Sequence, residues 1–218
     1  MNQTSNMLLI LAENCNFSVS DPDHVQQLKV SGMKFSIRTY HASALGHVSV
    51  MEATGFFGLM KMDTLIITPT EKDMPLFSYD RVLAMGNDTL IFELYDTLLG
   101  STDLSALEQV KQNAKYLPDH HLGSHWYDSM KLPVSLAKKG KKTHSPSFDA
   151  TATHYLAQYL IAAKNAPACE AAPKREKASV YVEGLLKNGG PSTDVFKKGI
   201  GEEKTAELFR KILFATEV

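Results

Sequence analysis

Three histidines near the middle of the chain have a spacing that could suit a metal ion. His120 and His121 are adjacent, and His125 follows shortly after them. Imidazole nitrogens are common zinc ligands. Adjacent histidines near the start of a helix are, however, more often solvated surface residues. We therefore assign no metal to this cluster.

The common motifs of nucleophilic and nucleotide-binding sites are not found in the sequence. No Ser or Cys lies in a recognisable nucleophile elbow, and the scattered histidines show no motif that would pair them with one. There is no phosphate-binding glycine loop, because Gly189 and Gly190 before Pro191 are typical of a helix end. Hydrolase chemistry and nucleotide binding therefore have no support.

Glu52 is a charged residue in an otherwise apolar segment. In Val48-Ser49-Val50-Met51-Glu52 a strand would place Glu52 on the same face as Val48 and Val50. A charge on an apolar face needs a partner or a function. If the strand frays here, Glu52 is instead a surface residue.

A compact basic cluster is formed by Lys138, Lys139, Lys141 and Lys142. Such a cluster is either a solvated turn or a surface that attracts an acidic partner. The whole chain has a formal net charge of -1, so no overall field favours nucleic acid or an anionic membrane. Only local clusters of charge could steer a partner.

Length and composition favour one globular unit. A chain of 218 residues with 44% hydrophobic content can bury one sizeable core, so we predict a single domain over residues 1–218. Cys15 and Cys169 are too few for a disulfide scaffold and indicate reduced thiols in a cytoplasm. The apolar run 7–12 is too short to span a bilayer and lacks a basic flank, so neither a membrane span nor a targeting segment is expected.

The first half of the chain alternates β-branched or aromatic residues with polar ones, which predicts successive hairpins. Strands are expected at 27–30 and 34–40, at 47–53 and 64–68, and at 81–85 and 89–95. Turns are expected at Ser31-Gly32, at 55–58 and at 86–88, where glycines and asparagine tolerate positive φ angles. These hairpins predict an antiparallel meander.

After residue 96 the hydrophobic period changes to that of a helix. The residues Leu104, Leu107, Val110 and Ala114 share one helical face, which Ser101 or Thr102 could cap. Further helices are expected at 148–163, 176–186 and 202–214, with loops at 138–146 and 165–173. A meander followed by helices predicts an α+β fold, a three-layer α/β/α sandwich with a central antiparallel sheet and helices on its faces.

Two motifs resemble the ferredoxin-dependent bilin reductases, which are related to red chlorophyll catabolite reductase. The stretch 64–69 is a strand that ends in Pro69, and the stretch 73–82 contains the pattern Pro-apolar-Phe-x-x-Asp-x-Val, with its aspartate at Asp80. The C-terminal part of the chain is similar to the pair of helices that closes the family's fold. The similar segments are Tyr181 to Asn188, 196–202 and 212–214. The resemblance covers about 29–214, with weak matching through 100–174.

The resemblance implies a fold in which an open-chain tetrapyrrole lies between the sheet and the C-terminal helices. It also implies that the protein binds no flavin, nicotinamide or metal cofactor. Reduced ferredoxin delivers single electrons to a biliverdin-like bilin, which is itself the electron acceptor. A monomer is expected, in the cytoplasm or the plastid stroma.

The resemblance also assigns roles to individual residues. Asp80 corresponds to the aspartate that donates a proton to the bilin, since burial in an apolar pocket would raise the pKa of its carboxyl. The alternative is an exposed aspartate at a strand start. Glu52 corresponds to a glutamate that lines the bilin site. Asn188 lies near a C-terminal Asn or Asp that faces the bilin, although Asn-Gly-Gly-Pro is also an ordinary helix end.

Thr64 departs from the family pattern, which has a histidine or an asparagine at its position. A shift of one residue would place Asp63 there instead. Thr64 cannot relay a proton by changing its charge, although its hydroxyl can bond a bilin carbonyl. Arg38 could pair with a bilin propionate, and the basic cluster could bind the acidic ferredoxin.

Two other functions remain open from the sequence. A bilin-binding carrier could keep the fold and lack the chemistry, which the Thr64 departure makes credible. A reductase of an opened chlorophyll catabolite would share the fold and the ferredoxin dependence.

Overall fold

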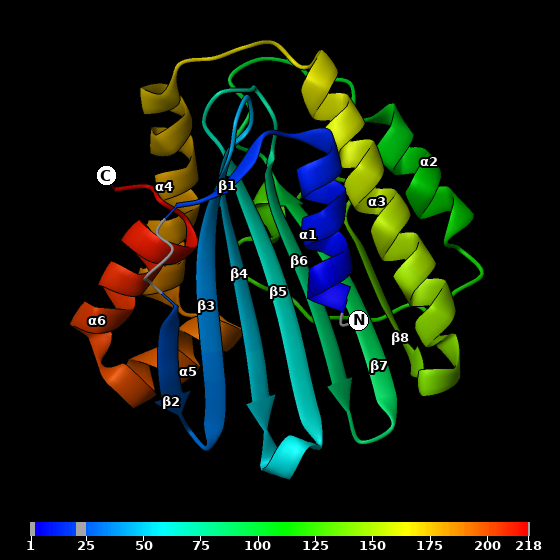
Figure 1. Ribbon diagram of the computed structural model, residues 1–218, viewed down its shortest axis with the longest axis vertical. Helices are drawn as coiled ribbons and strands as arrows, with labels where there is room; N and C mark the ends of the chain where they lie inside the picture. The colour runs from blue at the N-terminus through cyan, green and yellow to red at the C-terminus, as the bar shows by residue number, and fades with distance from the viewer. Residues whose placement is uncertain (1–2, 21–24, 218) are drawn as a thin grey trace.

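The computed structural model describes residues 3–20 and 25–217. Its centre is an eight-stranded antiparallel sheet with the strand order β1-β3-β4-β5-β6-β7-β8, in which β2 also pairs with β3 (Figure 1). The strands are β1 (Phe17–Val19), β2 (Gln26–Val30), β3 (Met33–Ala42), β4 (Gly46–Gly55), β5 (Met60–Pro69), β6 (Leu76–Ala84), β7 (Asn87–Tyr95) and β8 (Leu136–Lys141).

The predicted meander of hairpins is confirmed. Strands β2 and β3 turn at Ser31-Gly32, where Gly32 has a φ of 79°. Strands β4 and β5 are joined through the short 3-10 turn η1 (Phe56–Gly58), and β6 and β7 through Met85-Gly86. Because the pairing is antiparallel and in register, residues directly opposite one another point to the same face of the sheet.

Helices cover both faces of the sheet, so the α+β, three-layer architecture is also confirmed (Figure 1). The helices are α1 (Gln3–Asn14), α2 (Ser105–Asn113), α3 (Ser145–Asn165), α4 (Ala171–Asn188), α5 (Pro191–Ile200) and α6 (Glu202–Glu207), and α6 continues into the π-helical η4 (Leu208–Leu213). Helices α1, α2 and α3 pack on one face around Phe77, Phe92 and Tyr155. On the other face α4, α5 and η4 pack around Ile66, Tyr95 and Tyr181.

Several elements differ from the expectations. Residues 138–146 are not a loop: β8 runs to Lys141, and α3 already begins at Ser145. A lysine-rich edge strand is tolerated because the buried ammonium of Lys138 donates to Asp119 and to the carbonyl of Leu117. The N-cap of α2 is Leu104, without a side-chain cap from Ser101 or Thr102. Sequence reasoning also missed α1, β1 and α5.

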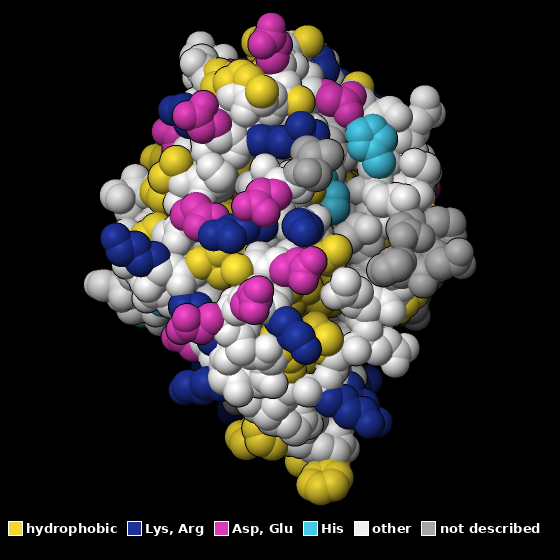
Figure 2. Space-filling model, turned by 90° about the vertical axis from the view of Figure 1, so that its left-hand side faces the viewer, with side chains coloured by type: hydrophobic (Ala, Val, Ile, Leu, Met, Phe, Trp, Pro, Cys, Tyr) yellow, Lys and Arg dark blue, Asp and Glu magenta, His cyan; other side chains and the backbone are white. Residues whose placement is uncertain are grey.

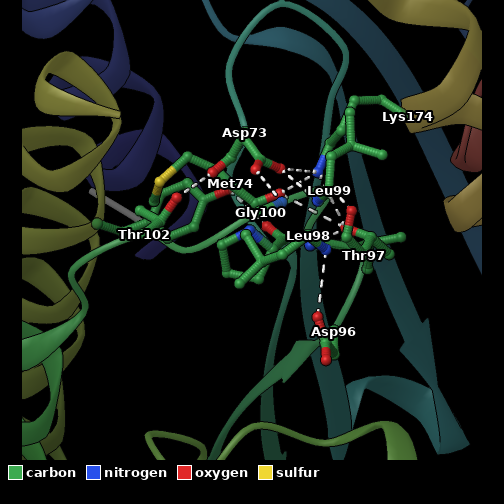
Figure 3. A network of polar contacts seen from close by, with 12 residues as sticks. Asp73, Met74, Asp96, Thr97, Leu98, Leu99, Gly100, Thr102 and Lys174 are labelled. Atoms are coloured by element: carbon green, nitrogen blue, oxygen red, sulfur yellow. Dashed lines mark hydrogen bonds and ion pairs between the residues drawn. The ribbon is translucent and has the colours of Figure 1, made fainter. Parts of the chain in front are cut away.

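A buried polar network fixes the position of α4 (Figure 3). The ammonium of Lys174 is fully buried and donates to the carbonyls of Met74 and Thr97, both at 2.7 Å, and lies 3.3 Å from a carboxylate oxygen of Asp73. Asp73 in turn accepts hydrogen bonds from the backbone N–H groups of Leu99 and Gly100. The network therefore ties α4 to the loops that follow β5 and β7.

Within the described residues, no helix combines the length and the apolar character that a bilayer-spanning segment requires.

Candidate functional site

A cavity of about 220 Å³ lies between the sheet and the C-terminal helices. Its floor is the face of β4 to β7, and its roof is formed by α4, the start of α5, η4 and the segment 122–127. Most of its lining is apolar or aromatic, with a few polar groups on the floor. Lining residues include Met51, Met62, Ile66, Val82, Ile91, Tyr95, Tyr181, Leu185, Phe209, Leu213 and Phe214. This combination of an apolar enclosure and few polar groups is typical of a site for a small organic ligand.

Asp80 and Thr64 form the polar centre of the cavity floor. They are directly opposite each other on β6 and β5, so the antiparallel register points both side chains into the cavity. The Thr64 hydroxyl donates a 2.5 Å hydrogen bond to Oδ1 of Asp80. Ser78, two residues earlier on the same strand face, donates a longer bond of 3.5 Å to Oδ2.

Burial raises the pKa of Asp80 to about 6. The hydrogen bonds from Thr64 and Ser78 act in the opposite direction, because they stabilise the carboxylate, while the nearby charge of Glu93 raises the pKa further. The carboxyl is thus set near the range in which it can both hold and release a proton at neutral pH.

Glu93 is a second carboxyl on the cavity floor that sequence reasoning missed. It lies on β7 opposite Ser78, accepts a 2.6 Å hydrogen bond from Tyr95 and forms a 3.3 Å ion pair with Lys131. The signal was present in the sequence, because Glu93 is a single charge in the apolar run 90–95. Such a charge requires a partner or a function.

His125 and Tyr127 reach the cavity from the segment between α2 and β8. Their rings stack at 4.9 Å. The segment is held on α4, because Trp126 packs on Gly184 and donates from its indole nitrogen to the carbonyl of Gly189. A Cβ at Gly184 would lie 2.1 Å from the Trp126 ring. His125, predicted only as a solvated residue, is therefore a titratable group in the cavity wall.

A second, more polar hollow of about 370 Å³ adjoins the first. The two share Glu93 and Leu122, and the second is also lined by His120, His121 and Lys131. The combined volume of the two hollows lies within the range of about 300 to 1,000 Å³ that is usual for ligand sites. Among the described side chains no cluster of three or more His, Cys, Asp or Glu is arranged to hold a metal ion.

The structure does not bring Glu52, Asp63 or Arg38 to this cavity, which corrects their prediction as residues of one site with Asp80. Glu52 and Asp63 are opposite each other on β4 and β5, one residue out of phase with Thr64, so they point to the other face. There Glu52 accepts a 2.8 Å hydrogen bond from Arg38. Glu52 and Asp63 line a separate cavity of about 600 Å³. Burial, followed by the charge of Glu52, raises the pKa of Asp63.

Two further predictions concern the ends of α4 and β8. Asn188 is exposed at the last residue of α4, outside the set of described residues that line the cavity. Gly189 follows with a φ of 81°, so the interpretation of this segment as a helix end holds. Within the basic cluster Lys138 is buried, whereas Lys139, Lys141 and Lys142 are exposed and available to a partner.

Comparison with known proteins gives a match in structure but not in sequence. No protein-family model and no curated protein matches the chain. The chain is similar to the crystal structure of phytochromobilin synthase from tomato in complex with biliverdin, with a TM-score of 0.77 and 15% sequence identity. The match covers 99% of this chain and 83% of the tomato chain.

Phytochromobilin synthase is a ferredoxin-dependent bilin reductase. The fold of this chain is therefore the fold of the bilin reductases. The resemblance inferred from the short motifs is confirmed for the fold.

Proposed function

We propose that this chain binds a linear tetrapyrrole in the cavity under α4 and η4 and reduces one of its double bonds, with Asp80 as the principal proton donor. The observation that carries the proposal is the Asp80 carboxyl, which faces an apolar cavity and has a pKa raised to about 6 by burial. The fold it shares with a protein that was crystallised with biliverdin supports the choice of ligand.

The proposed chemistry balances with two electrons and two protons for each double bond. Reduced ferredoxin gives one electron at a time to the bilin, and each electron is followed by a proton. At pH 7 a carboxyl with a pKa of about 6 is protonated in about a tenth of molecules, so Asp80 can donate and then be reloaded from solvent. The Thr64 hydroxyl stabilises the carboxylate that remains after each donation.

Ferredoxin is the proposed donor, and the exposed Lys139, Lys141 and Lys142 are its proposed docking residues because ferredoxins are acidic. The bilin is itself the electron acceptor, so the proposal requires no flavin, nicotinamide or metal.

A bilin carrier without turnover is the second candidate. The observation in its favour is that the partner of Asp80 is Thr64, a hydroxyl that cannot change its charge state. An opened chlorophyll catabolite is the alternative substrate for a reductase of the same fold.

An anaerobic absorbance assay tests the proposal. The protein is first titrated with biliverdin, and ferredoxin, its reductase and NADPH are then added while the long-wavelength band is followed. A saturable shift followed by conversion to a new bilin is expected. Binding without conversion would favour the carrier or another open-chain substrate, and no binding at all would refute the proposal for bilins.

A further inference from the structure

The turn between β4 and β5 carries a cluster of large apolar side chains in solvent. At this turn Phe56 is 60% exposed, Phe57 is 109% exposed and Leu59 is 70% exposed. Because Met60 pairs with Ala84, the β6–β7 turn lies beside it and adds Met85, which is 88% exposed. We call these four residues the apolar tip. It lies at the lower end of the sheet, where hydrophobic side chains protrude in the space-filling view (Figures 1 and 2).

The backbone of the apolar tip is held in a conformation that these residues rarely adopt. Phe56, Phe57 and Met85 have φ angles of 49°, 55° and 49°, in the left-handed region where Gly and Asn are usual. Phe56 and Phe57 bury little surface in return. Strained backbone of this kind is found most often in functional segments, and the burial of these side chains does not account for it here.

A row of lysines crosses the sheet next to the apolar tip. Lys29 on β2 pairs with Lys34 on β3, Lys34 pairs with Thr54, and Thr54 pairs with Lys61 on β5, so all three ammonium groups project from one face. All three lysines are exposed, and none forms an ion pair with a described residue.

Like charges directly opposite each other, such as Lys29 and Lys34, are unfavourable in an isolated sheet. An anionic surface would relieve this repulsion. Lys61 lies two residues from Leu59, or about 7 Å along the strand. The distance between the lysine row and the apolar tip is therefore similar to the thickness of the headgroup layer of a lipid bilayer. In Figure 2 the Lys and Arg side chains flank the hydrophobic end, while the Asp and Glu side chains lie higher on that face.

We propose that the apolar tip and the lysine row dock this protein on an anionic lipid bilayer. Phe56, Phe57, Leu59 and Met85 enter the interface, and Lys29, Lys34 and Lys61 contact lipid phosphates. The net charge of -1 gives no overall attraction, so this local row supplies the electrostatic part of the binding. Exposed apolar patches mark either protein or membrane interaction sites, and the lysine row beside this one favours an anionic bilayer.

Co-sedimentation of the full chain with vesicles tests this inference. Vesicles of 70% phosphatidylcholine and 30% phosphatidylglycerol are compared with vesicles of phosphatidylcholine alone, at low and high salt. Binding is expected only to the anionic vesicles and should weaken with salt. The double variant Phe56→Ser, Phe57→Ser should bind at least about tenfold more weakly. Each Lys→Gln change in the row should weaken binding up to about fivefold.

Matched controls separate the apolar tip from general surface effects. Tyr116→Ser with Val180→Ser removes exposed apolar side chains elsewhere, and Lys115→Gln with Lys187→Gln removes exposed charges elsewhere. Both controls should bind like the parent chain. All variants are checked by circular dichroism for an unchanged fold.

A Phe57→Trp variant reports insertion directly, because its fluorescence should shift to the blue on addition of anionic vesicles and be quenched by brominated lipid. The inference is overturned if the parent chain does not bind anionic vesicles, or if the tip and control variants bind equally. It is also overturned if the tip variant instead abolishes a concentration-dependent dimer or raises the KM for ferredoxin without any vesicle binding.

Discussion

The hydroxyl of Thr64 donates a 2.5 Å hydrogen bond to Asp80 across two neighbouring strands. Burial raises the pKa of Asp80, and this bond opposes the rise because it stabilises the ionised carboxylate. Thr64 therefore adjusts the proton affinity of Asp80 without changing its own charge. In the proposed reductase, Asp80 is the acid and Thr64 is the residue that positions it.

Asp80→Asn should retain bilin binding and lose most turnover. The change keeps the shape of the side chain and its hydrogen bond from Thr64 but removes the proton, so we expect a fall of about 100-fold or more and accumulation of a bilin radical. Glu52→Gln is the matched control, because Glu52 lies on the opposite face of the sheet. Turnover is measured anaerobically by absorbance and the radical by electron paramagnetic resonance. An unchanged rate in Asp80→Asn would remove Asp80 from the mechanism.

The same variant should change the pH dependence of folding stability. Because the pKa of Asp80 is about 6 in the folded chain and 3.8 in the reference state, the folded state loses stability as the pH rises from 3.8 to about 6, and the penalty is complete above that range. The penalty is absent below pH 3.8. Asp80→Asn should therefore be more stable than the parent by about 1 to 3 kcal/mol at pH 8, and this advantage should disappear at about pH 3.

Urea unfolding at the two pH values measures this difference. Glu203→Gln, at an exposed position on α6, is the control and should change stability at neither pH. Equal stability of Asp80→Asn and the parent at both pH values would show that the carboxyl is not desolvated.

Thr64→Val should raise the pKa of Asp80 above its value in the parent chain, because the ionised carboxylate loses its closest donor. Thr64→Ser keeps the hydroxyl and should leave the pKa nearly unchanged. Carboxyl carbon NMR on protein labelled at aspartate follows the titration directly. If Thr64→Val and Thr64→Ser titrate at the same pH, the hydrogen bond has no influence on the acid.

The meander could be predicted from sequence because its strands alternate and their turns contain glycine. Gly32 and Gly86, for example, have φ angles of 79° and 77°, which the sequence signals by residue type alone. The edge strand β8 could not be predicted, because Lys138 and Lys139 are typical of a solvated loop. Only the folded chain places Asp119 beside Lys138, where it pairs with the buried ammonium. That contact joins residues whose proximity no local pattern encodes.

The candidate site could be predicted from the sequence only in part. Asp80 and Thr64 were found through their motif, and their register places them together. Glu52 was assigned to the same site, but in a strand a shift of one residue exchanges the two faces, and its face with Val48 and Val50 is the one away from the cavity. The roof residues His125 and Tyr127 come from a segment whose placement depends on Trp126 packing against Gly184.

Neutralising Lys139, Lys141 and Lys142 together to Gln should raise the KM for ferredoxin several-fold and weaken its salt dependence, with kcat at saturating ferredoxin unchanged. These three lysines are exposed near the end of β8. Lys138 is left in place, because its buried ammonium is paired with Asp119 and its loss would disturb the fold. Lys115→Gln with Lys187→Gln is the charge control. An unchanged KM would assign the cluster a structural role.

Lys174→Met should be one of the most destabilising substitutions outside the cavity. The Lys174 ammonium is fully buried, and its removal leaves the carbonyls of Met74 and Thr97 without this donor and the buried carboxylate of Asp73 without its nearest cation. Breaking one side of a buried pair costs about 3 to 5 kcal/mol. Lys177→Met, an exposed position on the same helix, is the control and should cost little.

Chemical unfolding measures the loss in Lys174→Met, and the double variant Asp73→Asn, Lys174→Met tests its cause. Because both changes remove the same Asp73–Lys174 ion pair, the double variant should lose less stability than the sum of the losses in the two single variants. Since α4 also carries Tyr181 and Leu185 over the cavity, bilin affinity should fall together with stability in Lys174→Met. A Lys174→Met chain as stable as Lys177→Met would show that the network in Figure 3 does not hold α4 in place.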